Sequence, residues 1–254
     1  MAGMETAAET ALPVFIIYLE AMIAQGTGDT ATALILYNNP MLSLSTADDN
    51  NNNNNNTPLP KRRSPILNDL SILATLNTIL IIHRPSHPQH HRLESLLSLL
   101  EGLDTTTPSG NMRGAYFLIR ALHSDASTDP LTNPILNTKT NLREVLQIAK
   151  QTANSQFSCV SLTFMTDRFF RGQVGEQAHK SASTALNLAR RGKNDLWTSV
   201  AEGLLAACLE TRGQVAEAEV RRKEAMRLAG GLPAGMQVFD DDDGHDGETM
   251  DIGA

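Results

Sequence analysis

Apolar side chains recur every three or four residues along most of the chain, which is the spacing that places them on one face of an α-helix. The clearest runs are Leu12/Phe15/Ile16/Leu19/Ile23, Leu93/Leu96/Leu97/Leu100, Leu142/Val145/Leu146/Ala149 and Ala178/Ala182/Ala185/Ala189. No comparable segment alternates polar with β-branched apolar residues, as a half-buried strand does. The sequence therefore predicts an all-α protein of roughly ten helices.

Two stretches lack the apolar residues that a packed structure needs. Residues 46–65 contain seven consecutive asparagines followed by three prolines, and the residues from about 235 onward are polar and acidic. Little apolar surface is available there to offset the entropy of ordering. We expect four parts, namely a helical repeat pair over 1–45, a disordered linker over 46–65, a helical-repeat domain over 66–234 and a disordered acidic tail over 235–254.

A repeated spacing of small residues predicts how the helices are arranged. Near the C-terminus, Gly213 is followed by Ala218 five residues later and by Ala225 seven residues further on. This is the spacing of a tetratricopeptide unit, in which glycine forms the turn and small residues let helices cross closely. Looser copies lie at Gly28/Ala33/Tyr37 and at Gly172/Ala178/Ala185. The prediction is a tetratricopeptide-like superhelix, an α-α solenoid whose concave side is suited to an extended or helical peptide.

The formal charge of −7 is concentrated at one end of the chain. Seven acids and no Lys or Arg lie in residues 240–254, so the remaining 21 acids balance the 21 bases of the body. A nucleic-acid backbone requires an excess of Lys and Arg on some face. We therefore expect no direct nucleic-acid binding.

Neither the cysteines nor the apolar run near the N-terminus indicates secretion or a membrane. Cys159 and Cys208 are too few for a disulfide framework and too widely spaced for a zinc motif, which favours a reducing intracellular compartment. The run 12–24 contains Glu20, follows further acids and is too short to cross a bilayer. We expect no membrane association.

Enzyme signatures are absent from the sequence: there is no nucleophile elbow, phosphate-binding glycine loop, His-Glu-x-x-His or Cys-x-x-Cys. His87, His90 and His91 would suit a metal site, but only Glu94 lies nearby, so a solvated turn is the favoured interpretation. The two cysteines have no adjacent base and are interpreted as buried packing residues. We expect no catalysis, cofactor, metal or small-molecule substrate.

The candidate partner-binding residues are Arg168, Phe169, Phe170, Arg171 and Trp197. The first four belong to the densest aromatic and basic segment of an aromatic-poor chain. Arginine and aromatic residues often anchor a partner at an interface. The alternative is that the phenylalanines pack in the core and that Trp197, the only tryptophan, packs between helical units.

Three segments, 73–78, 164–178 and 196–205, resemble the fungal branch of the cohesin loading factor family, the tetratricopeptide subunit of the chromosomal cohesin loader. The resemblance runs from about Tyr18 to Leu228. It implies a non-enzymatic nuclear scaffold that wraps the extended N-terminal segment of a large HEAT-repeat partner. Through that partner it would act on cohesin and chromatin in sister chromatid cohesion. It also implies that this chain corresponds to the C-terminal third to half of a longer family member.

One alternative remains open from the residues themselves. A tetratricopeptide superhelix also suits a generic adaptor in a ubiquitin-ligase or chaperone-linked assembly. The proteins that co-purify with the chain would discriminate between the two.

Overall fold

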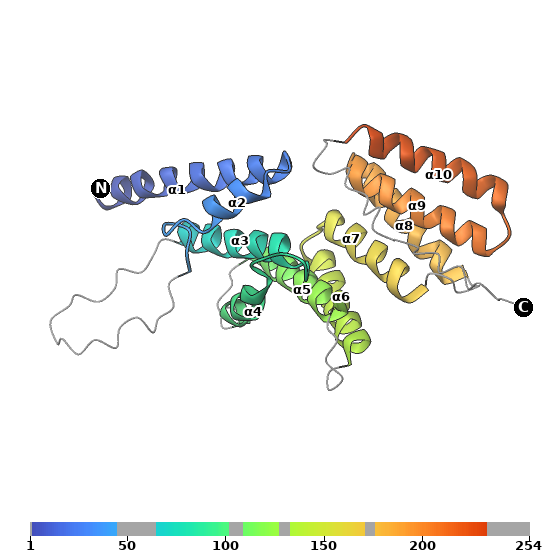
Figure 1. Cartoon of the computed structure of the whole chain (residues 1–254), viewed down its shortest axis with the longest axis horizontal. Coiled ribbons are helices and arrows are strands. Elements are labelled where there is room, and N and C mark those ends of the chain that lie inside the picture. The colour runs from blue at the N-terminus through green and yellow to red at the C-terminus, as the bar shows by residue number, and fades with distance from the viewer. Residues whose placement is uncertain (1, 45–64, 102–108, 127–132, 171–175, 233–254) are drawn as a thin grey trace, which may run out of the picture.

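The computed structural model of the chain describes residues 2–44, 65–101, 109–126, 133–170 and 176–232. Within these ranges it contains ten α-helices and no strand, so the all-α prediction is confirmed (Figure 1). The helices are α1 (Ala2–Gly26), α2 (Thr30–Tyr37), α3 (Pro65–Ile82), α4 (Leu93–Glu101), α5 (Gly110–Ala126), α6 (Pro134–Gln151), α7 (Ser155–Met165), α8 (Glu176–Arg191), α9 (Asp195–Thr211) and α10 (Val215–Gly230). The asparagine run and the acidic tail lie outside the described residues, and the proposed four-part division stays a prediction.

Four of the turns between helices have the same local structure. A residue with positive φ stands at Gly28, Ala153, Lys193 and Gly213. In each turn the backbone N–H of the next residue donates to the carbonyl five residues earlier, at 2.9–3.1 Å. This is the six-to-one hydrogen bond of a Schellman motif, which ends one helix just before the next begins. The side chains of Asp29, Asn154 and Asn194 then cap the following helix.

The small residues of the predicted repeat lie where helices approach closely. Ala33 and Ala218 are fully buried, as are Ala182 and Ala185 of the alanine run. The spacing after Gly28 and Gly213 is therefore confirmed, because a larger side chain has no room at these crossings. Gly172, the turn residue of the third copy, lies outside the described residues.

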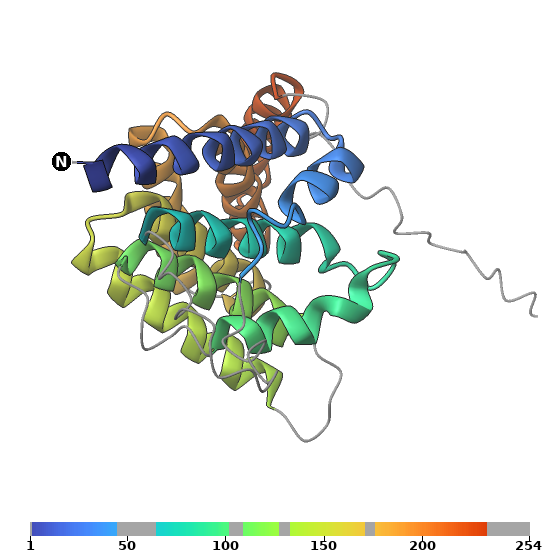
Figure 2. The same cartoon turned by 90° about the vertical axis from the view of Figure 1, so that its left-hand side faces the viewer.

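Most of the buried apolar residues in the described ranges belong to three clusters along the chain. One lies among α1, α2 and α3 and another among α2, α3, α4 and α5. The third lies among α7, α8, α9 and α10. Successive helices pack against one another along a curved path, with α1 and α10 at the top of both views and α4–α6 lower (Figures 1 and 2). This arrangement confirms the helical-repeat solenoid.

The apolar run of α1 forms a helix but does not form the face that packs. Phe15, Ile16 and Ile23 are exposed, whereas Val14 and Tyr18 are buried against α2 and α3. The reason is that α1 is apolar on nearly every side, so spacing identifies the helix without identifying its inner face. In α4 and α6, where polar residues occupy the outer side, most residues of the predicted runs are buried.

Candidate partner-binding surface

The aromatic and basic segment lies in a π-helical turn, Thr166–Phe170, that continues directly from α7. Single π turns are rare and often occur at functional sites. Three predicted residues, Arg168, Phe169 and Phe170, belong to this turn. Arg171 lies outside the described residues.

Arg168 extends from the turn toward solvent. Its guanidinium carbon lies 5.9 Å from the centroid of the Phe164 ring, and its Nε lies 3.7 Å from Oδ2 of Asp167. The side chain is nevertheless 51% exposed. Contacts of this kind at the surface contribute at most about 1 kcal/mol. They position the guanidinium, and about half of the side chain stays exposed to solvent.

The two phenylalanines of the turn are both partly buried. Phe170 packs against the C-terminal core cluster. The structure thus gives Phe170 the packing role that the sequence left as one of two alternatives. A contact between either ring and a partner stays a prediction.

Trp197 lies in the first turn of α9, where its backbone N–H donates to Oδ1 of Asn194 at 3.1 Å. Its indole packs against the C-terminal core. It also lines a cavity of about 310 Å³ between the α6–α7 turn and the α8–α9 turn, together with Asn154, Cys159 and Leu188. The side chain of Trp197 therefore both packs against the core and lines the cavity.

Trp197 and Phe170 pack against the same core cluster, but no residue of the π turn lines the cavity beside Trp197. The cavity beside Trp197 lies at the N-terminal half of α7, where Ser155 and Cys159 contribute to its lining. Phe170 stands eleven residues beyond Cys159. At 1.5 Å per residue, this separation is roughly 16 Å along the helix. The predicted residues form two patches on one stack of helices.

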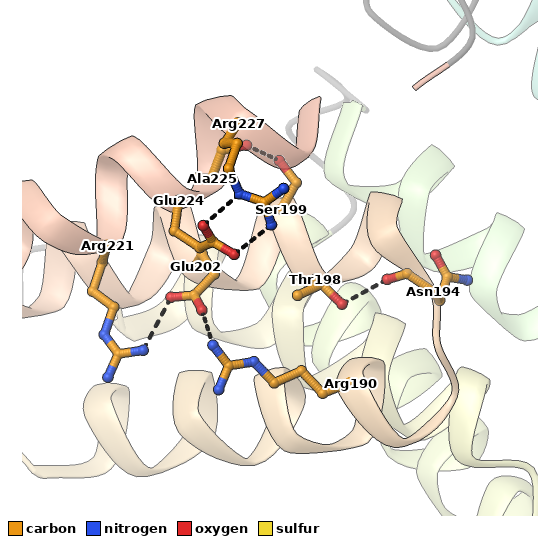
Figure 3. A network of polar contacts seen from close by, with 9 residues as sticks. All are labelled: Arg190, Asn194, Thr198, Ser199, Glu202, Arg221, Glu224, Ala225 and Arg227. Carbon is orange, nitrogen blue, oxygen red and sulfur yellow. Dashed lines mark hydrogen bonds and ion pairs between the residues drawn. The ribbon is translucent and has the colours of Figure 1, made fainter. Parts of the chain in front are cut away.

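The sequence reasoning missed a buried ion-pair network that joins α8, α9 and α10 (Figure 3). Glu202 is fully buried; its Oε1 accepts from Arg190, and its Oε2 lies 3.4 Å from Nη1 of Arg221. Nearby, Ser199 Oγ donates to the carbonyl of Ala225 at 2.8 Å. A buried carboxylate requires such partners because its desolvation is costly. The available signal was a single acid within the otherwise uncharged stretch 196–209 of α9.

His87 and His90 make local contacts with the backbone, and the two cysteines are buried. Nδ1 of His90 lies 3.1 Å from the carbonyl oxygen of Ile82, and Nδ1 of His87 accepts the backbone N–H of Gln89. Burial raises the pKa of the thiols of Cys159 and Cys208, which disfavours the reactive thiolate. In the described part of the chain, no group of three His, Cys, Asp or Glu side chains could hold a metal ion.

None of the helices in the described segments, α1 included, is both long and apolar enough to span a bilayer.

Antiparallel helices joined by repeated short turns define a helical-repeat protein of the α-α solenoid class. A family model described as cohesin loading factor matches residues 1–216, and the chain belongs to the cohesin loading factor family. The resemblance in the segments at 73–78, 164–178 and 196–205 is thereby confirmed. Membership assigns the chain a role in cohesin loading and with it a chromosomal role. No curated protein and no solved structure matches the chain.

Proposed function

We propose that the protein is a non-enzymatic scaffold subunit of the cohesin loader. It holds the extended N-terminal segment of a large HEAT-repeat partner in the nucleus. By doing so it supports cohesin loading onto chromatin, sister chromatid cohesion and chromosome partition in mitosis. The observation that carries the proposal is the curved stack of helical pairs in a chain of the cohesin loading factor family.

The separation of the candidate residues suits an extended ligand. Arg168 lies nine residues beyond Cys159, which lines the cavity beside Trp197, so the two patches are roughly 14 Å apart along α7. An extended segment rises about 3.3 Å per residue, so roughly four residues would span the two patches. We expect Arg168, Phe169, Phe170, Arg171 and Trp197 to contribute contacts to such a segment.

Contact with chromatin would then run through protein partners. Several cations of the C-terminal helices are already paired with carboxylates: Arg190 and Arg221 with Glu202, and Arg222 with Glu210. Paired cations offer little to a phosphate backbone, whose affinity depends on neutralisation by available Lys and Arg. The balanced charge of residues 1–239 supports the same expectation.

The direct test is binding of the full chain to the N-terminal segment of the HEAT-repeat loader subunit from the same organism. We expect Arg168→Glu to weaken binding about tenfold, the loss typical of an interface anchor. Lys150→Glu is the matched control, because it reverses an equally exposed charge on α6. Failure of the chain to bind this segment, with co-purification of ubiquitin-ligase or chaperone subunits, would support the generic adaptor.

A further inference from the structure

A groove runs between the α1–α2 turn, the length of α2 and the C-terminal end of α3. It consists of two adjoining hollows of about 630 and 690 Å³ that share Thr30 and His87 in their linings. We call it the α2–α3 groove and define it by Met22, Ile35, Leu80, Arg84, His87 and Arg92. Figure 1 shows α2 between α1 and α3. None of these residues belongs to the π turn or to the surroundings of Trp197.

Large apolar side chains line this groove and face solvent. Ile35 is 74% exposed, and Met22 and Leu80 are each more than 40% exposed. These three side chains come from three different helices, so the exposed apolar surface is shared by α1, α2 and α3. Removing apolar surface from water contributes about 25 cal/mol per Å². An apolar side chain of a ligand therefore gains free energy by covering them.

The charge of the groove is one-sided. Arg84 and Arg92 contribute to its lining, whereas no Asp or Glu among the described residues lines either hollow. The guanidinium of Arg92 donates to Oε1 of Gln89 at 2.8 Å and to Oδ1 of Asn38 at 3.0 Å. Both acceptors are neutral amides, so they position the guanidinium without neutralising it.

Several other charged residues of the chain differ from Arg92 in the partners that they already have. Arg190, Arg222 and Arg227 of the C-terminal helices all contact glutamates, unlike Arg92. Asp29 lies next to the groove, but its carboxylate accepts the backbone N–H of Thr32 at 3.0 Å and caps α2. The guanidinium of Arg92 therefore remains available to a carboxylate of a ligand.

The lining also indicates the class of ligand. Bases of a nucleic acid stack on aromatic side chains, and within the described ranges no aromatic residue lines these two hollows. Exposed aliphatic side chains beside a cation match a peptide segment that carries apolar anchors and carboxylates. Charge complementarity thus favours an acidic protein segment.

We infer that the α2–α3 groove binds a short amphipathic segment of a partner protein, with large apolar side chains over Ile35 and Leu80 and carboxylates toward Arg92. This site goes beyond the proposed function, because it lies away from the π turn and Trp197 and requires no particular partner. The groove is a second docking surface on the same solenoid.

The probe is a displayed library of random peptides of about 16 residues, selected on the full-length protein. We expect enriched peptides to combine carboxylates with large apolar side chains and to lose affinity as salt rises. Enrichment of neutral or basic peptides would overturn the inference.

Point variants then locate the bound peptide. Arg92→Glu and Ile35→Lys should each weaken the best peptide at least about tenfold. The matched controls are Lys150→Glu on α6 and Val220→Lys on α10, which make the same changes at exposed positions elsewhere. Circular dichroism verifies that all four variants fold. Equal binding by Arg92→Glu and the parent would overturn the inference.

A last measurement distinguishes a partner from the acidic end of this chain. The four aspartates 240–243 are replaced with asparagine in the full-length protein. Unchanged peptide affinity supports a partner segment as the ligand. Binding about tenfold tighter would mean that these aspartates compete at high effective concentration, and the assignment to a partner would fail. Retained binding of the HEAT-repeat segment by Arg92→Glu leaves the proposed function intact.

Discussion

Single residues at the turns determine how the helices connect. Gly28 and Gly213 have positive φ, as the sequence pattern predicts, but Ala153 and Lys193 adopt the same conformation. The sequence does not reveal the latter two, because positive φ is rare for residues other than glycine. Their Schellman hydrogen bonds and the asparagine caps that follow hold them in place.

A pair of glycine substitutions tests this conformation directly. An added Cβ meets no neighbouring atom within 4 Å at either Gly213 or Gly203, so crowding is absent from both. Gly213 has φ of 75°, whereas Gly203 lies inside α9. Gly213→Ala should cost about 1 kcal/mol of unfolding free energy, and Gly203→Ala should gain about 1 kcal/mol. Urea denaturation measures both, and changes of the same sign would contradict the assigned turn.

The closest helix crossing gives a second prediction at this scale. Ala218 is fully buried between α9 and α10, so Ala218→Leu should overpack the crossing and cost about 1 to 3 kcal/mol. Ala216→Leu is the control, because Ala216 lies in the same helix and is exposed. Thermal unfolding of both variants at the same temperature as the parent would show that the repeat is misplaced.

At the scale of the helices, the sequence predicts which segments form helices better than it predicts which face of each helix packs inward. α4 and α6 have polar outer sides, so their inner faces follow from the pattern, whereas α1 is apolar all round and its inner face does not. The candidate binding residues are likewise predicted only in part: the sequence indicates their accessibility but not their arrangement in space. Arg168 is accessible as expected, but the distance between the π turn and Trp197 depends on helix packing that no local pattern encodes.

The ion pairs of Glu202 with Arg190 and Arg221 join three helices, and a single substitution removes their charge. Glu202→Gln keeps the shape of the side chain but removes the charge that Arg190 and Arg221 contact. Both arginines are partly exposed, which reduces the expected cost to about 1 to 2 kcal/mol of unfolding free energy.

Glu210→Gln is the control for that variant, because Glu210 pairs with Arg222 at the surface. Exposed pairs contribute about 0 to 1 kcal/mol. Chemical denaturation compares the two variants. A cost for Glu202→Gln no larger than that for Glu210→Gln would show that the buried network does not stabilise the packing of α8, α9 and α10.

At the scale of the whole molecule, the three core clusters follow one another along the solenoid. The cluster of α7 to α10 shares no residue with the two clusters of α1 to α5. In repeat proteins of this kind, each unit is stabilised mainly by its own packing and by its neighbours. Strain introduced at one end should therefore stay near that end.

Hydrogen exchange of the full-length protein tests this locality. Ala218→Leu should speed amide exchange in α9 and α10 and leave α1, α2 and α3 at the rates of the parent, because the overpacked crossing touches only the last cluster. Ala33→Leu, at the fully buried alanine of the N-terminal copy of the repeat spacing, should do the reverse. Mass spectrometry of proteolytic fragments resolves the helices. Uniformly faster exchange across all helices in either variant would mean that the solenoid unfolds as one cooperative unit, contrary to its nearest-neighbour packing.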